Sequence, residues 1–225
     1  AATTAGRAVP TVATIVHGVL ANVVLGILVA AAFLAGGSPV EGSWLAGFTA
    51  ACGGLTYLGV ALLAAQLMRT SRGANSLAVW VLVVTYFIAG IGNALGTPSD
   101  DLTHMQSSWL TWLSPFGWAE NTRAFDENLW WPAFLCLAAF VVLAGVALAL
   151  QTVRDLGASI VPERRGRAAA GATLSTPTAL VTRLATGSTI GWMAGAFFAG
   201  ALSTSLGAVV NEMGSDNPAV ADMLK

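Results

Sequence analysis

The fold of this chain is decided by stretches such as WPAFLCLAAFVVLAGVALAL, residues 131–150, in which no charged residue interrupts the apolar side chains. Four more charge-free runs of this kind lie elsewhere in the chain, at residues 10–34, 43–67, 76–95 and 184–210. About 20 apolar residues cross a bilayer as a helix, and a helix satisfies its own backbone hydrogen bonds in lipid. The runs are continuous rather than alternating, which disfavours membrane strands. The sequence therefore predicts an all-α integral membrane protein with five transmembrane helices.

The composition agrees with this class. Apolar residues make up 56% of the 225 residues and charged residues 9%, and the mean hydropathy is +0.72, whereas a soluble domain carries about 25% charged residues. The net charge of −1 makes nucleic acid an unexpected partner. Cys52 and Cys136 both lie in apolar runs, so neither a disulfide framework nor a metal cluster is expected. Residues 1–9 lack the layout of a signal peptide, and we expect an integral membrane protein or a piece of one.

Basic residues flank the five runs unevenly. Alternate flanking segments hold eight of the ten: Arg7, Arg69, Arg72, Arg154, Arg164, Arg165, Arg167 and Arg183. The remaining segments hold Arg123 and Lys225 together with acidic residues such as Glu41 and Asp126. Because positive charge is retained on the cytoplasmic side, we expect a multi-pass protein of the cytoplasmic membrane with its N-terminus inside and its C-terminus outside.

Five of the eight tryptophans lie between residues 108 and 131, in or beside the segment 97–130, which this orientation places on the outer face. Tryptophan is enriched where hydrocarbon meets water. Four apolar residues follow the stripe of an amphipathic helix: Trp109, Trp112, Leu113 and Phe116. Pro115 is expected to end or bend this helix near Ser114, and Gly117 to allow a sharp turn. The segment is then either an aromatic belt without further role or a cap over a translocation route.

The segment 151–187 is expected to be a cytoplasmic linker that ends in a short helix along the inner interface. Thr176 or Thr178 would cap this helix, with Pro177 in its first turn. Such a helix is either a contact for a cytoplasmic partner or an ordinary basic anchor. Two sets of glycines indicate close helix packing rather than hinges: Gly187, Gly191 and Gly195, and Gly90, Gly92 and Gly96.

The sequence contains no phosphate-binding loop, no nucleophile motif and no metal-ligand spacing. We therefore expect no enzyme, no metal site and no cofactor in this chain, and any ATP would be bound by another polypeptide. His17 is the titratable group nearest neutral pH within the runs; a hydrogen-bonded packing histidine and a proton relay are the two interpretations. No carboxylate lies in the runs, which argues against a carrier coupled to protons or sodium.

Several short motifs carry a family resemblance. They are LSPFGW at 113–118, RAF at 123–125, WWP at 130–132, RDLGA at 154–158 and DNPA at 216–219. From about Val12 onward, the chain resembles the permease subunits of actinobacterial ABC-type exporters of the polyketide-antibiotic and multidrug class.

The resemblance implies two six-span halves in a type V (ABC-2-like) exporter fold. Residues 1–150 would be the last four spans of the first half, with 97–130 as an outer re-entrant segment. Residues 151–187 would be the linker with its connecting helix, and 188–225 the first span of the second half. The coupling helix of the family has no counterpart among these residues.

The function implied is that of a permease subunit of an ATP-driven exporter, which moves amphipathic drugs, antibiotics or lipids outward. ATP and Mg²⁺ would be bound by a partner ATP-binding subunit, expected to be a dimer. An ion-gradient-driven carrier and a membrane scaffold subunit remain the alternatives. The candidate residues along the substrate path are Asn22, Thr85, Tyr86, Asn93, Thr189 and Ser203. Those of an outer lid are Trp109, Trp112, Pro115 and Trp118, and Arg183 is the candidate contact with the partner.

Overall fold

The computed structural model describes residues 9–98, 105–153 and 176–216, with side chains described for most of them. The chain forms two compact units, residues 1–163 and 164–225, which are treated separately. The long helices of the first unit are α1 (Val9–Ala35), α2 (Val40–Leu67), α3 (Ser71–Ala94) and α5 (Trp131–Val153). Between α3 and α5 lie β1 (Thr97–Pro98), β2 (Met105–Gln106), the 3₁₀ helix η1 (Trp109–Leu113) and α4 (Pro115–Glu120). The second unit contains α6 (Pro177–Asp216).

Four helices among the described residues are long and apolar enough to cross a membrane: α1, α2, α3 and α5. Their bounds follow four of the predicted runs closely, and the chain is an all-α, multi-pass membrane protein. Its strands are limited, among the described residues, to the antiparallel pairing of Thr97 with Gln106 and of Pro98 with Met105. The fifth predicted span, 184–210, lies in α6, where many side chains beyond Phe197 are outside the described set, so the fifth span stays a prediction.

Helix ends depart from the apolar runs where polar residues cap them. α3 begins at Ser71, before the predicted run, because the Thr70 hydroxyl accepts a hydrogen bond from the Gly73 N–H at 3.1 Å. α6 begins at Pro177, and the Thr176 hydroxyl accepts from the Ala179 N–H at 3.3 Å, as expected for its cap. α6 runs unbroken from Pro177 past residue 188, so the connecting helix expected before this point would form the first part of α6 and stays a prediction.

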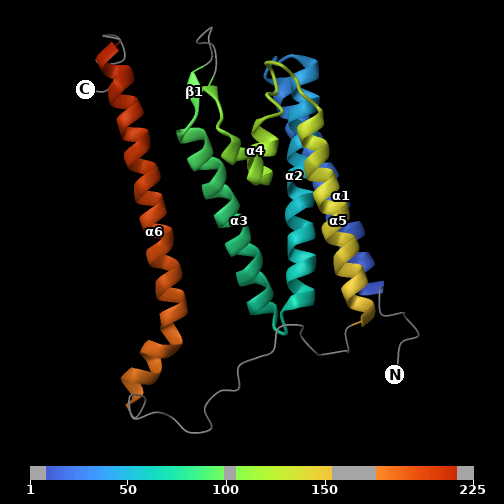
Figure 1. The fold of residues 1–225 in the computed structure, drawn as a ribbon, viewed down its shortest axis with the longest axis vertical. Coiled ribbons are helices and arrows are strands. Elements are labelled where there is room, and N and C mark those ends of the chain that lie inside the picture. The colour runs from blue at the N-terminus through green and yellow to red at the C-terminus, as the bar shows by residue number, and fades with distance from the viewer. Residues whose placement is uncertain (1–8, 99–104, 154–175, 217–225) are drawn as a thin grey trace. The chain divides into compact units, whose positions relative to one another are not determined.

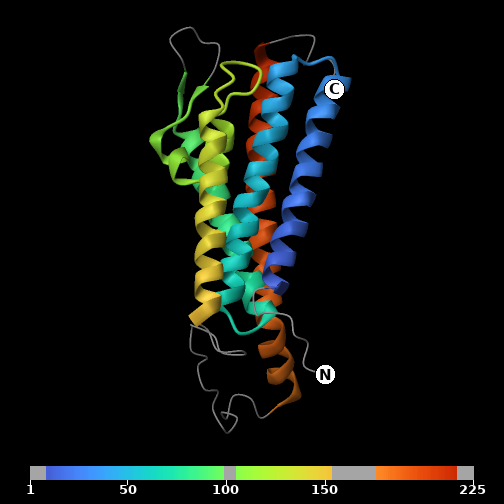
Figure 2. The same ribbon diagram turned by 90° about the vertical axis from the view of Figure 1, so that its right-hand side faces the viewer.

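α2 is the central helix of the first unit and lies between α1 and α5 (Figure 2). Glycines bring α1 close to it: a Cβ on Gly26 would lie 2.7 Å from the Gly47 carbonyl oxygen. Towards α5, the Thr56 hydroxyl donates to the Cys136 carbonyl at 2.8 Å. Below that contact, five buried side chains form an apolar core: Leu55, Leu62, Phe140, Ala144 and Ala147. Small residues on α2 therefore decide how closely its neighbours approach.

Candidate functional site

Residues 107–125, here called the inserted segment, enter the bundle beside the upper end of α3 (Figure 1). The segment bends at Ser114, where η1 ends and α4 begins. The buried Ser114 hydroxyl accepts from the Phe116 N–H at 3.2 Å and donates to the Thr85 carbonyl at 2.6 Å. The bend predicted from Pro115 is thus confirmed. The sharp turn expected after Gly117 is not found there, because α4 continues to Glu120. Gly117 instead permits a close approach, since a Cβ on it would overlap the Thr111 carbonyl oxygen.

Contacts with the end of α3 hold the segment in place. The Ser108 N–H donates to the Gly92 carbonyl at 3.1 Å, and a Cβ on Gly92 would lie 2.6 Å from the Thr111 methyl group. Asn93 donates to the Glu120 carboxylate at 2.6 Å and accepts from the Ser107 hydroxyl at 2.9 Å. Close packing at Gly92 was expected from the sequence, and a Cβ on Gly96 would likewise meet the Gln106 carbonyl at 2.7 Å. Gly90 differs, because nothing lies within 4 Å of its Cβ position.

The tryptophans of the inserted segment have two different environments. Trp109 is 73% exposed. Trp112 stacks on Trp131 at the start of α5, with ring centroids 5.0 Å apart and planes 6° from parallel. The Trp118 indole N–H donates to the Trp112 carbonyl at 2.6 Å. Of these side chains, Trp112 and Trp118 therefore fix the shape of the segment, while Trp109 is free to face its surroundings.

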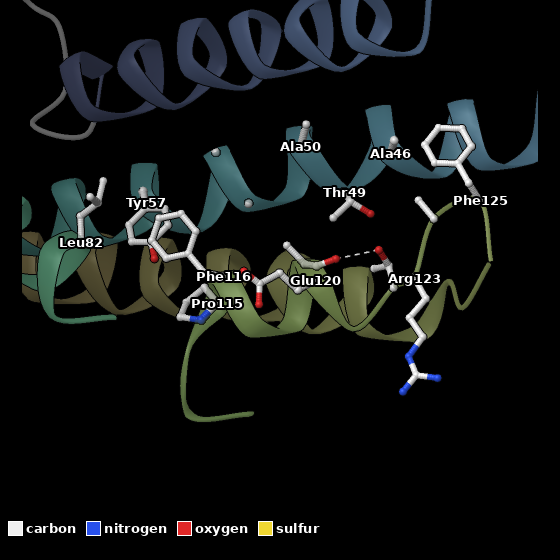
Figure 3. Close-up of a pocket in the computed structure, with 15 residues that line it drawn as sticks. Ala46, Thr49, Ala50, Tyr57, Leu82, Pro115, Phe116, Glu120, Arg123 and Phe125 are labelled. Carbon is white, nitrogen blue, oxygen red and sulfur yellow. Dashed lines mark hydrogen bonds between the residues drawn. The ribbon is translucent and has the colours of Figure 1, made fainter. Parts of the chain in front are cut away.

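A cavity of about 770 Å³ lies between α2 and the inserted segment (Figure 3). Its α2 wall is built from small residues and its ends from aromatic rings. The rings of Tyr57 and Phe116 lie together at one end, with centroids 5.1 Å apart, and the ring of Phe125 lies at the other (Figure 3). The lining residues are Ala46, Thr49, Ala50, Gly53, Gly54, Tyr57, Leu82, Pro115, Phe116, Ala119, Glu120, Thr122, Arg123, Ala124 and Phe125.

Thr49 is the buried polar residue of this wall. It is 7% exposed, and its hydroxyl has no hydrogen-bond partner among the residues that the structure describes. Figure 3 shows the side chain on the face of α2 that looks towards α4, near the middle of the cavity. A buried hydroxyl without a partner costs free energy.

The charged residues of the lining are engaged elsewhere. The Arg123 guanidinium turns away from α2 (Figure 3) and pairs with Glu127. The Glu120 carboxylate accepts the hydrogen bond from Asn93. Arg123 and Phe125 both have positive φ angles, 44° and 75°. Non-glycine residues seldom adopt this conformation. At Phe125 the conformation is stabilised by packing of the ring on Phe33, with centroids 4.9 Å apart.

The structure brings some of the predicted path residues to this site. Thr85 shares a hydrogen bond of 2.8 Å with the Tyr57 hydroxyl, and Tyr86 packs edge-to-face on Phe116 at 5.5 Å. Both support the cavity without being part of its lining. Asn93 lies just above it, bound to Glu120.

The other candidates are not among the residues that line the cavity. Asn22 donates to the Gly18 carbonyl on α1 and sits against Gly54, at the α1–α2 contact. Arg183 and Thr189 are exposed on α6, where Ser203 also lies with its side chain outside the described residues. His17 is exposed on α1 and has no hydrogen bond with any described residue, so the expected hydrogen-bonded packing histidine is not found.

Reasoning from the sequence missed Thr49, Tyr57 and Phe125 as site residues. One signal was present: Ala46, Ala50, Gly53 and Tyr57 follow the helical repeat along one face of α2. Small residues at this spacing also mark close helix packing, as at Gly47 and Gly54. The pattern alone therefore does not tell a cavity wall from a helix contact.

Fold and cavity define a helical, multi-pass membrane protein with a mainly apolar site among its helices. Residues 174–225 match the family model described as the C-terminal domain of the multidrug efflux system permease Rv1217c. Over 207 residues the chain is 33% identical to the multidrug efflux system permease protein Rv1217c of Mycobacterium tuberculosis (strain ATCC 25618 / H37Rv). This alignment covers 91% of the chain and 35% of the relative, so the chain spans about a third of the relative's length. The resemblance to permeases of multidrug exporters is thereby confirmed.

Proposed function

We propose that the chain is part of the permease subunit of an ATP-driven exporter of amphipathic drugs, antibiotics or lipids. The observation that carries this proposal is the 33% identity to a multidrug efflux permease along nearly the whole chain. The drug-sized cavity supports it, because small-molecule sites are commonly mainly apolar hollows of roughly 300–1,000 Å³.

The arrangement of the spans follows the type V exporter template. The four helices of the first unit would close the first six-span half, with residues 97–130 as the outer re-entrant segment and Trp109, Trp112, Pro115 and Trp118 as its lid. α6 would carry the connecting helix and the first span of the second half, with Arg183 placed for a cytoplasmic partner. That partner would be an ABC ATP-binding subunit, acting as a dimer, which binds ATP and Mg²⁺.

The distribution of charge supports an inward-facing N-terminus. Arg69 and Arg72 lie in and beside the α2–α3 connection, whereas Glu41, Glu120 and Asp126 lie at the opposite end of the bundle (Figure 1). Because basic residues are retained in the cytoplasm, the end with Arg69 and Arg72 would face inward. The inserted segment would then face outward, across the cytoplasmic membrane.

An ATP-driven mechanism is favoured over an ion-coupled carrier. Titratable groups inside the membrane mark ion pathways and proton relays, and the four apolar runs of the first unit contain no carboxylate. His17 is exposed on α1 rather than placed in a hydrogen-bonded relay among the described residues.

Purification of the full-length protein from its native membrane tests the proposal. We expect a Walker-type ATPase to co-purify, and its ATP turnover in nanodiscs to rise when an amphipathic drug is added. Loss of another membrane protein's assembly on deletion, with no co-purified ATPase and no change in drug efflux, would favour a scaffold instead.

A further inference from the structure

We infer that the cavity between α2 and the inserted segment binds an apolar organic cation, whose positive group pairs with the Glu120 carboxylate and whose apolar part lies along α2. The inference rests on the proposed function and deepens it, because it names the charge of the cargo that such an exporter would hold. Binding is measured without ATP, so its failure and the failure of ATP-driven export can be told apart.

Glu120 supplies a negative charge that no described cation neutralises. Its carboxylate accepts a hydrogen bond from the Asn93 side chain at 2.6 Å. Because Asn93 is neutral, this bond orients the carboxylate and leaves its charge in place. The basic residue of the lining is Arg123, whose guanidinium turns away from α2 and pairs with Glu127 (Figure 3). Among the described residues, the lining therefore contains a carboxylate without a counter-ion.

Aromatic rings beside the cavity favour the same sign of charge. Glu120 follows Phe116 by four residues on α4, so the two side chains lie on the same side of this helix. The Phe116 ring packs against the Tyr57 ring, with centroids 5.1 Å apart, and both rings line the cavity. The faces of such rings attract cations. A cation at Glu120 therefore has an aromatic group within the same wall.

The rest of the lining offers space for an apolar body. Ala46, Ala50 and Gly53 form a shallow wall on α2, which ends at the Tyr57 ring. From Ala46 to Tyr57 the helix rises by roughly 16 Å, which is long enough for a molecule with several rings. Burial of apolar surface would supply most of the affinity, and the carboxylate would select the charge.

The wider charge distribution supports this selectivity. The described charged residues at this end of the first unit are Glu41, Glu120, Asp126, Glu127 and Arg123, which gives four carboxylates and one guanidinium. Such an excess of one sign attracts ligands of the opposite sign. An anionic amphiphile, such as a fatty acid, would instead place its carboxylate beside Glu120 and be repelled.

Two probes of nearly equal size and shape test the inference. Methyltriphenylphosphonium is a cation, and triphenylphosphine oxide is its neutral counterpart, with an oxygen in place of the methyl group. Binding of radiolabelled methyltriphenylphosphonium to the full-length protein, in an uncharged detergent and without ATP, is measured by scintillation proximity. We expect saturable binding that weakens as sodium chloride is raised, because salt screens the pair with an exposed carboxylate. The neutral probe should compete about fivefold less well than the unlabelled cation.

Matched variants locate the charge. Glu120→Gln keeps an oxygen that accepts from Asn93 and removes the charge, so it should weaken binding of the cation about threefold and abolish the salt dependence. Asp126→Asn removes a charge from an exposed residue outside the lining and should change neither.

A second pair of variants locates the cavity. Nothing lies within 4 Å of a Cβ at Gly53, so Gly53→Leu occupies the cavity without displacing a neighbour and should abolish saturable binding. Gly145→Leu, on α5, has equally open surroundings and lies outside the lining, and it should leave binding unchanged.

Each outcome bears on one claim. Equal competition by the two probes, or unchanged binding and salt dependence in Glu120→Gln, would overturn the inference. Saturable binding that Gly53→Leu leaves intact would overturn it as well. A drug-stimulated ATPase in the same preparation would then keep the proposed function. Charge-selective binding that depends on Glu120, without any associated ATPase, would support the site and count against ATP-driven export.

Discussion

Trp109 and Trp112 lie three residues apart, yet their roles in the fold differ. The Trp112 ring is stacked on Trp131 and its carbonyl accepts the Trp118 indole N–H, whereas Trp109 is 73% exposed. An aromatic pair contributes about 0.5–1.5 kcal/mol beyond the area it buries. The first tryptophan therefore marks the surface of the segment, and the second ties the segment to α5.

Replacement by alanine should separate these roles. We expect Trp112→Ala to lower the melting temperature of the purified protein by a few degrees, through loss of about 1 kcal/mol of stacking. Trp109→Ala should leave it nearly unchanged. Differential scanning fluorimetry in detergent measures both variants side by side, and equal melting temperatures would refute the structural role of Trp112.

The inserted segment as an element depends on a glycine contact with α3. Gly92 lets the Thr111 backbone approach, since a Cβ at this position would lie 2.8 Å from the Thr111 nitrogen. Gly90 belongs to the same helix and the same glycine cluster, but its Cβ position is open. The two glycines thus offer a matched pair for testing how the segment is seated.

Alanine should destabilise the protein at one of these positions and not at the other. Gly92→Ala should destabilise the protein by about 1–3 kcal/mol, because overpacking displaces the segment. Gly90→Ala should cost nothing, since alanine is the better helix former. Thermal unfolding and limited proteolysis of the segment check both, and a Gly92→Ala variant as stable and as resistant as the Gly90→Ala protein would be inconsistent with the close approach.

For the inserted segment and the helices around it, some features could be predicted from the sequence and others could not, for physical reasons. The bend at Ser114 was predictable because proline has no N–H and restricts the residue before it. The insertion of the segment between helices was not, because its docking depends on Gly42 and Gly92, which are distant in sequence. Thr49 and Thr56 lie two helical turns apart on similar faces of α2, so periodicity does not distinguish them. Only the neighbouring elements show that the Thr56 hydroxyl donates to the Cys136 carbonyl, while Thr49 is part of the cavity wall.

In the molecule as a whole, the four spans were predictable because hydrocarbon demands about 20 apolar residues. The helix ends were less so, since caps such as Thr70 extend a helix beyond the apolar run. Each helix alternates in direction, so the Arg69–Arg72 connection and the Phe125–Trp130 loop lie at opposite ends of the first unit (Figure 1).

Cysteine labelling tests which end faces the cytoplasm. With an outward inserted segment, a cysteine at exposed Asp126 should react with a membrane-impermeant maleimide in intact cells, while one at exposed Ser71 should react only after permeabilisation. The native Cys52 and Cys136 are buried and give the background in the unmodified protein. The reverse pattern would invert the proposed orientation.

ATP-driven export is the central claim. It is measured as movement of a dye from the membrane into the lumen of inside-out vesicles. Hoechst 33342 fluoresces in lipid and darkens when it is moved into water, so export appears as a fall in fluorescence. We predict a fall that requires ATP, that persists when ionophores abolish the ion gradients, and that is weaker with Gly53→Leu than with Gly145→Leu. A fall that proceeds without ATP and stops on addition of ionophores would contradict the account and identify an ion-coupled carrier.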